Sequence, residues 1–258
     1  MNAALTELTG IAPEILVPAF LVFLRIGAVM FMLPVFGEML VPMRVRLAAA
    51  LAFTFVVVPA VLPGVQDRID TAGSLYTLGL FEVITGLALG LSLRLILMGL
   101  QIAATIAAQS TSLAQLLGGS AVDPQPAIGF VLLLAALALA VELGLHVQLS
   151  LMFIRSYDLV AAGAAIGGGD LAGWVVRAVS AAFTFAFTLA APFVAVSLLY
   201  NLALGVINRA MPQLMVAFVG APAITFGSLI LLALTAPLML WLWAERFETG
   251  IQAPFGTR

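Results

Sequence analysis

The sequence predicts an all-α integral membrane protein built from helical hairpins, with some of its helices broken. Hydrophobic residues make up 64% of the 258 positions and charged residues only 9%, and the mean hydropathy is +1.22. A soluble domain of this size cannot bury so much apolar surface, so lipid or a large apolar partner must cover the remainder.

The same composition excludes several classes of function. There is no cysteine, which rules out disulfides and thiolate metal sites. A single histidine cannot form a His-based metal motif, so we expect no metal and no cofactor. All 10 cationic side chains are arginines that do not cluster, so nucleic-acid binding is not expected. Glu7 and Glu14, without a basic region, argue against a cleaved signal peptide.

Six apolar stretches are the predicted helices, and we assign them to one membrane-embedded domain covering residues 1–258. They lie at residues 15–36, 47–65, 75–109, 127–154, 176–207 and 214–244. Each contains the ~20 residues needed to cross ~30 Å of hydrocarbon. Polar or Gly/Pro-containing connections separate them, at residues 37–46, 66–74, 110–126, 155–173 and 208–213.

Some of these stretches do not fit a simple span. At ~1.5 Å per residue the third would be about 50 Å long, so it must tilt, bend or leave the membrane. Gly86 and Gly90 within it have the small-xxx-small spacing that lets helix backbones approach closely, although this motif is common in such sequences. Prolines within or beside apolar stretches predict kinked or broken helices. They are Pro59, Pro192, Pro222 and Pro237. The arginines are distributed too evenly to choose a topology.

Five ionisable residues fall inside apolar stretches: Arg25, Glu82, Arg94, Glu142 and His146. A charge at the centre of a bilayer costs about 2.5–3.5 kcal/mol on insertion scales, so these side chains should face protein or water. A transport pathway is one interpretation. Packing against one another or against another subunit is favoured, because no repeat of charged positions suggests a proton relay. Glu142 and His146, at i and i+4 on one helix face, suit an internal hydrogen bond.

A polar stripe follows the third stretch. Arg94, Gln101, Thr105, Gln109 and Ser112 fall within about 80° of one another on a helix with 100° per residue. The stripe leads into a polar segment that carries Ser110, Thr111, Ser112, Gln115, Gly118, Gly119, Ser120, Asp123 and Pro124. Two interpretations explain the stripe equally well. It could line a hydrated passage, or it could form interhelical hydrogen bonds at ~1 kcal/mol each.

One motif suggests an enzyme. Gly167 to Asp170 fits the Gly-x-Gly-Asp pattern that resembles intramembrane aspartyl proteases, with Tyr157-Asp158 as the second dipeptide. About 12 Gly-rich residues between the two aspartates cannot form two facing spans and a turn, so we reject this interpretation. Asp170 as the N-cap of a helix starting near Leu171 explains the motif better. We expect no catalytic residue, because no nucleophile and base form a pair.

Residues 208–213 are the predicted turn between the last two helices. Asn201, Arg209, Pro212 and Gln213 are expected to hold this turn. Arg209 could neutralise the exposed carbonyls at a helix C-terminus.

An ordered set of motifs makes the chain recognisable. The first group is Phe-Leu-Arg-Ile-Gly at 23–27, Leu-Pro-Val-Phe-Gly at 33–37 and Val-Pro-Met-Arg-Val-Arg-Leu at 41–47. The last is Ala-Pro at 191–192, the run at 201–214 and Phe-Val-Gly-Ala-Pro at 218–222. Between them lie Glu-Val-Ile-Thr-Gly-Leu-Ala-Leu-Gly at 82–90 and Asp-Pro at 123–124. Together they resemble the FliR family of flagellar proteins, whose injectisome counterparts are the SctT subunits, and residues 41–46 favour the flagellar branch.

The resemblance implies a non-enzymatic subunit of the type III export gate, in the bacterial inner membrane at the flagellar basal body. The implied partners are FliP and FliQ homologues, the export components FlhB and FlhA, membrane lipids, and the unfolded flagellar proteins that pass through. Many helices in such gates are lifted out of the bilayer and packed on other subunits, which would bury Arg25, Glu82 and Glu142. Residues 110–126 match the loop that plugs the closed channel.

The alternative function is a small-solute secondary transporter. Arg94 and Glu142 would then form its substrate or proton site. Inverted repeats would favour this alternative. However, the halves on either side of residue 126 place their prolines and arginines differently.

Overall fold

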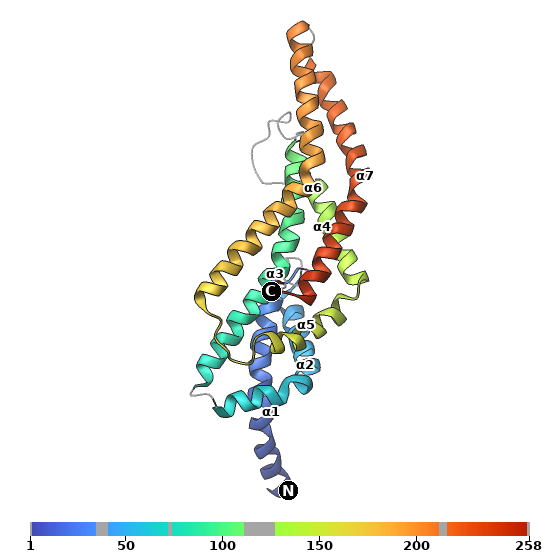
Figure 1. Ribbon diagram of the computed structural model, residues 1–258. Coiled ribbons are helices and arrows are strands. Elements are labelled where there is room, and N and C mark those ends of the chain that lie inside the picture. Colours follow the sequence, from blue (N-terminus) through green and yellow to red (C-terminus); the bar gives the residue numbers. More distant parts are fainter. Residues whose placement is uncertain (1, 35–40, 72–73, 111–126, 212–215, 257–258) are drawn as a thin grey trace. The chain divides into compact units, whose positions relative to one another are not determined.

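The computed structural model describes residues 2–34, 41–71, 74–110, 127–211 and 216–256, and within them the chain is helical without strands (Figure 1). The helices are α1 (Asn2–Met32), α2 (Met43–Thr71), α3 (Leu75–Ser110), α4 (Ala127–Glu142), α5 (Leu145–Leu159), α6 (Gly168–Ala210) and α7 (Val216–Gln252). The predicted all-α fold is confirmed.

These helices suit a membrane. In the described residues, five helices are long and apolar enough to cross one. A sixth span would be the pair formed by Gly129–Glu142 and Leu145–Leu159, whose axes differ by 72°. The prediction of apolar membrane helices, one of them broken, is therefore confirmed.

The break between α4 and α5 lies at a glycine. Gly144 has a left-handed backbone with φ of 72°, and its N–H donates to the carbonyl of Val141 at 3.0 Å. By contrast, Pro59 and Pro192 lie inside the continuous helices α2 and α6. No break therefore occurs at these two prolines, and the kinks predicted there stay a prediction. A glycine that accepts positive φ can end a helix more completely than a missing N–H does.

Two smaller predictions about helix ends also need correction. Glu142 ends α4 and His146 lies in α5, so these two residues do not share the face of one helix. Asp170 lies in the first turn of α6 rather than at its N-cap, because the carbonyl of Gly167 already accepts the N–H of Leu171 at 2.9 Å. A carboxylate in the first turn still interacts favourably with the helix dipole.

The helices form two compact units by their internal packing. The first comprises Met1–Arg94, Val141–Arg177 and Glu248–Arg258, and the second Leu95–Ala140 and Ala178–Phe247. We call them unit 1 and unit 2 and describe each separately. The single domain predicted for residues 1–258 stays a prediction.

In unit 1, α1 packs directly against α3. A Cβ on Gly86 would lie 2.3 Å from the carbonyl oxygen of Arg25, and a Cβ on Gly90 would lie 2.7 Å from the Cβ of Met32. Only glycine permits this separation of the two backbones. Ile26 and Leu89 are fully buried beside this contact, so the small-xxx-small spacing is a real helix interface.

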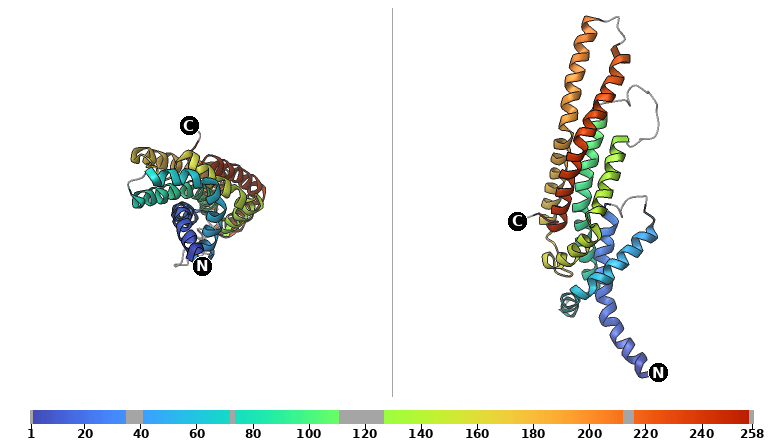
Figure 2. Two further views of the ribbon diagram at one scale, coloured as in Figure 1. Left: turned by 90° about the horizontal axis from the view of Figure 1, so that it is seen from below. Right: turned by 90° about the vertical axis from the view of Figure 1, so that its right-hand side faces the viewer.

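In unit 2, small residues again allow close packing. The second part of α3 buries Ala103, Ala104 and Ala107, and a Cβ on Gly99 would lie 3.0 Å from the Phe185 ring of α6. Segments of α6 and α7 lie side by side in both side views (Figures 1 and 2). Their other faces carry large exposed apolar side chains: Phe187, Leu198, Leu199, Leu202 and Val206 on α6, and Phe226, Leu234, Leu238 and Trp241 on α7.

Candidate functional site

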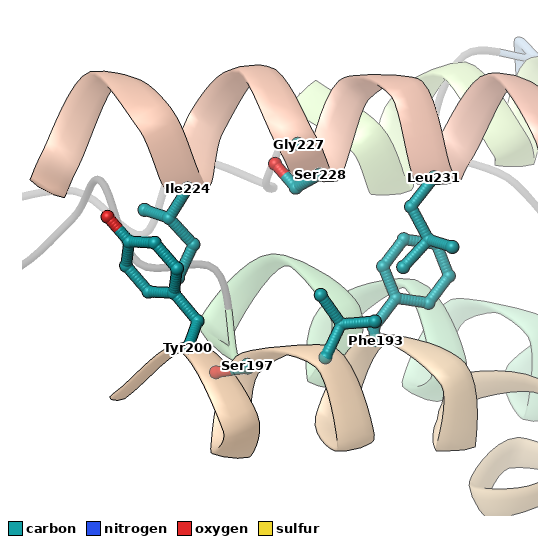
Figure 3. Close-up of a pocket in the computed structure, with 8 residues that line it drawn as sticks. Phe193, Ser197, Tyr200, Ile224, Gly227, Ser228 and Leu231 are labelled. Carbon is teal, nitrogen blue, oxygen red and sulfur yellow. The ribbon is translucent and has the colours of Figure 1, made fainter. Parts of the chain in front are cut away.

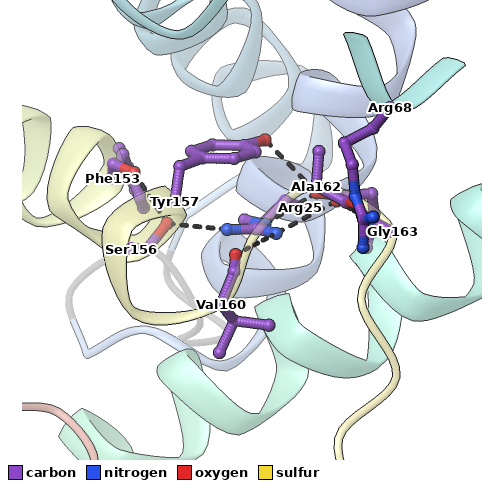
Figure 4. Close-up of polar contacts among 9 residues, drawn as sticks. Arg25, Arg68, Phe153, Ser156, Tyr157, Val160, Ala162 and Gly163 are labelled. Atoms are coloured by element: carbon purple, nitrogen blue, oxygen red, sulfur yellow. Dashed lines mark hydrogen bonds and ion pairs between the residues drawn. The ribbon is translucent and has the colours of Figure 1, made fainter. Parts of the chain in front are cut away.

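The most complete polar arrangement in the described residues is a buried ion pair in unit 1 (Figure 4). Arg25 of α1 is 1% exposed and Glu82 of α3 is 0% exposed. The Arg25 Nε donates to Glu82 Oε2 at 2.6 Å, and Nη2 donates to Oε1 at 3.0 Å. This two-pronged geometry is the strong form of an arginine–carboxylate contact, and it joins α1 to α3 beside Gly86.

Further groups at the C-terminal end of α5 also contact the arginine. Its Nη1 donates to the Ser156 hydroxyl and its Nη2 to the Val160 carbonyl, both at 3.1 Å. The guanidinium carbon lies 3.7 Å from the centre of the Tyr157 ring, which is the geometry of a cation–π contact. Arg25 thus touches three residues of the α5 end besides Glu82.

The carboxylate of Glu82 is equally well satisfied. It accepts the Tyr157 hydroxyl at 3.2 Å and the backbone N–H of Gly163 at 2.7 Å. One positive and one negative charge are therefore buried together, and each makes additional hydrogen bonds to other groups. A buried pair is tolerable only when such additional hydrogen bonds compensate for the loss of water. The arrangement carries no net charge and suits a structural role.

The structure places the other predicted intramembrane charges elsewhere. Arg94 is half-buried on α3, whereas Glu142 and His146 are exposed on the surface of this chain. The burial of Glu142 by a second subunit stays a prediction. Sequence reasoning singled out Arg25 and Glu82 but not their pairing, and it missed Ser156 and Gly163. No local signal connects side chains separated by 57 to 135 positions.

The predicted polar stripe lies on α3 up to its end. Gln101 and Thr105 are half-buried and Gln109 is exposed, and the Thr105 hydroxyl donates to the carbonyl of Gln101 at 2.9 Å. Thr105 thus satisfies its hydroxyl on its own helix. Ser112 lies outside the described residues, so the two interpretations of the stripe stay open.

The end of α3 is tied to α6 by a contact that the sequence did not indicate. The Ser197 hydroxyl of α6 donates to the carbonyl of Ser110, and the Asn201 amide donates to the Ser197 hydroxyl at 3.2 Å. Ser110 is the first residue of the predicted plug segment. The rest of that segment, residues 111–126, lies outside the described residues.

The predicted turn residues separate into three groups. Asn201 lies inside α6, so it is not a turn residue, because its helix continues to Ala210. Arg209 lies in the last turn of α6, as predicted for a cation at a helix C-terminus. Pro212 and Gln213 lie outside the described residues.

One cavity in unit 2 lies between α6 and α7 (Figure 3). Its volume is about 70 Å³, and it is lined by Phe193, Val196, Ser197 and Tyr200 from α6 and Ile224, Gly227, Ser228 and Leu231 from α7. Binding sites for drug-sized molecules enclose about 300–1,000 Å³. This cavity is smaller than that range, and its lining includes neither Arg94 nor Glu142. The transporter alternative stays a prediction. No group of three or more potential metal ligands occurs in the part of the chain that the structure describes.

Long apolar helices, a broken span and an internally neutralised ion pair define a helical integral membrane protein. Residues 16–250 match the family model described as "Bacterial export proteins, family 1", and the chain belongs to this family. The family predicted from the motifs is therefore confirmed.

The sequence aligns with those of curated relatives over most of their length. The chain is 32% identical to flagellar biosynthetic protein FliR of Caulobacter vibrioides, over 89% of this chain and 92% of that protein. It is 30% identical to FliR of Bacillus subtilis, over 83% and 86% of the two chains, and 27% identical to FliR of Escherichia coli, over 87% and 88%. These matches support a membrane component of flagellar protein export.

Proposed function

We propose that this chain is the FliR-type subunit of the flagellar export gate in the bacterial inner membrane at the basal body. It assembles with FliP and FliQ homologues into the channel for unfolded flagellar proteins and works with the export components FlhB and FlhA. The observation that carries this proposal is the family match over residues 16–250, together with FliR relatives that align over nearly their whole length. The chain itself contributes no catalytic step.

The surface of unit 2 agrees with assembly. Leu198, Leu202 and Val206 of α6 and Phe226 and Leu234 of α7 are each at least 63% exposed. So large a set of exposed apolar side chains needs lipid or protein to cover it. In the proposed gate, FliP and FliQ homologues cover part of these faces.

The proposal predicts a stable complex and a secretion defect. A tagged copy of the chain, extracted in mild detergent, should co-purify with the FliP and FliQ homologues. Deleting its gene should abolish motility and remove flagellar filament protein from the medium, and the full-length gene should restore both. Normal secretion in the deletion strain would overturn the proposal, as would a lone chain that transports a small solute in liposomes.

The plug assignment gives a second prediction. We propose that Ser110 to Pro126 closes the resting channel, supported by the family resemblance and by the Ser197 contact that holds the carbonyl of Ser110. Deleting residues 112–120 should make cells that express the complete gate leaky to small ions. The same deletion in a strain without the FliP homologue is the control, because no channel forms there. Unchanged conductance with the gate assembled would contradict the plug role.

A further inference from the structure

We infer that three charged side chains clamp residues 160–163 of this chain into a fixed elbow, and that this clamp is the role of the buried ion pair. The elbow is defined as Val160, Ala161, Ala162 and Gly163, which follow the end of α5 at Leu159. All the groups involved belong to unit 1. The inference does not depend on the proposed function.

The backbone of the elbow requires hydrogen-bond partners from outside the segment. Where a chain leaves a helix, its backbone groups lose their regular partners, and burying them unpaired is costly. Ala162 is 4% exposed and Val160 and Gly163 are half-buried. In a membrane protein, irregular backbone within the hydrocarbon region is tolerated only where protein or trapped water satisfies it.

Charged side chains from three different helices supply the missing partners (Figure 4). Arg25 of α1 donates to the Val160 carbonyl at 3.1 Å, and Arg68 of α2 donates to the Ala162 carbonyl at 3.1 Å. Glu82 of α3 accepts the Gly163 N–H at 2.7 Å. Two cations thus hold two carbonyls and one anion holds the N–H, so each charge matches the polarity of its backbone partner.

The backbone of the elbow adopts two different non-helical conformations. Val160 is extended, with φ of −136°, and Gly163 is left-handed, with φ of 61°. A Cβ on Gly163 would lie 1.9 Å from Cδ2 of Leu78 on α3. The elbow is therefore pressed against α3 at the glycine and held by hydrogen bonds from charged side chains to its backbone. It sets the point from which the chain continues to α6 at Gly168.

Arginine is required at position 25 for geometric reasons. Its planar fork contacts Glu82, Ser156 and Val160 at the same time. A lysine ammonium keeps the charge but presents its three donors from one nitrogen, so it cannot span these partners. The Arg25→Lys substitution therefore separates the clamp from the simple ion pair.

The absence of cysteine allows a direct test. An Ala162→Cys reporter in the otherwise unchanged full-length chain marks the buried side of the elbow, and an Ala161→Cys reporter marks its exposed neighbour. Membranes from cells that carry the whole export apparatus are treated with N-ethylmaleimide, and the modified fraction is followed with time. We expect the Ala161→Cys reporter to react quickly and the Ala162→Cys reporter slowly.

Loss of the clamp should expose the buried position. With Arg25→Lys, the Ala162→Cys reporter should react about tenfold faster, the effect expected when about one hydrogen bond no longer holds the closed state. Arg155→Lys, the same change at an exposed arginine of α5, should leave the rate unchanged. The Ala161→Cys rate should not respond to either substitution.

A second variant covers the case in which Arg25→Lys does not accumulate. Arg68→Ala removes only the contact to the Ala162 carbonyl and changes an exposed side chain, so the fold should persist while the Ala162→Cys rate rises. Two results would overturn the inference: equal reactivity of the two reporters in the parent, or an Ala162→Cys rate that neither arginine substitution changes. A gate that fails to assemble would affect the proposed function but not this readout, which can be repeated on the chain expressed alone.

Discussion

Replacing Gly86 with alanine is expected to force α1 and α3 apart and to lower the stability of the chain markedly. The new Cβ would lie 2.3 Å from the carbonyl oxygen of Arg25 and 2.8 Å from the Cβ of Ala28. Neither neighbour is the mobile end of a long side chain, so the helix backbones must shift. Overpacking of this kind costs about 1–3 kcal/mol and sometimes more. The loss should be larger than for ordinary helix substitutions, because the shift also strains the neighbouring Arg25–Glu82 pair.

The measurement is the temperature at which the detergent-solubilised, fluorescently tagged chain loses its elution peak. Gly64→Ala is the matched control in α2, because a Cβ there meets nothing within 4 Å. That control should keep or exceed the parental temperature, because alanine favours a helix more than glycine does. If Gly86→Ala and Gly64→Ala behaved alike, the close contact of α1 with α3 would be refuted.

The second large effect is expected for Arg25→Leu. This change leaves Glu82, which is 0% exposed, with a charge and no cation. Breaking a buried pair by removing one partner typically costs about 3–5 kcal/mol. The carbonyl of Val160 and the Ser156 hydroxyl lose a donor as well. We expect a strong fall in the amount of folded chain in membranes and in its thermal stability in detergent.

A compensating substitution distinguishes the charge from the clamp. Arg25→Leu combined with Glu82→Gln removes the unpaired charge, so it should recover part of the stability lost in the single variant. The double variant should not recover all of the lost stability, since the Val160 carbonyl still lacks its arginine donor. Comparing both single variants with the double variant gives the coupling between the two positions. Parental stability of Arg25→Leu alone would show that the ion pair contributes little.

The positions of the helices could be predicted because hydropathy is a local property. Each apolar stretch was long enough to span a bilayer, and a helix was found at every one. Their ends were less accurate. The second stretch was predicted at 47–65 but α2 covers Met43–Thr71, and the fifth at 176–207 but α6 covers Gly168–Ala210. Helical hydrogen bonds continue into polar sequence, so apolar content marks the part of a helix that needs lipid or protein rather than its termini.

The candidate site was predicted less completely. Arg25 and Glu82 were recognised as charges that need a partner, and the structure pairs them with each other inside the chain. Gly86 and Gly90 carried a signal for close helix packing, but the motif is too common in membrane sequences to be decisive by itself. The sequence indicated Tyr157 only as part of a protease-like dipeptide. It gave no indication of a role for Gly163.

By itself the amino-acid sequence determined that this chain is helical, belongs in a membrane, and is a member of the export family, because composition, apolar length and ordered motifs are all readable along the chain. Only the tertiary structure decided that Arg25 meets Glu82 and that both hold the backbone after α5. The physical reason is distance along the chain. Which buried charges meet depends on how α1, α3 and α5 pack, and that packing includes the close approach of Gly86 to the backbone of α1 and of Gly163 to Leu78 of α3.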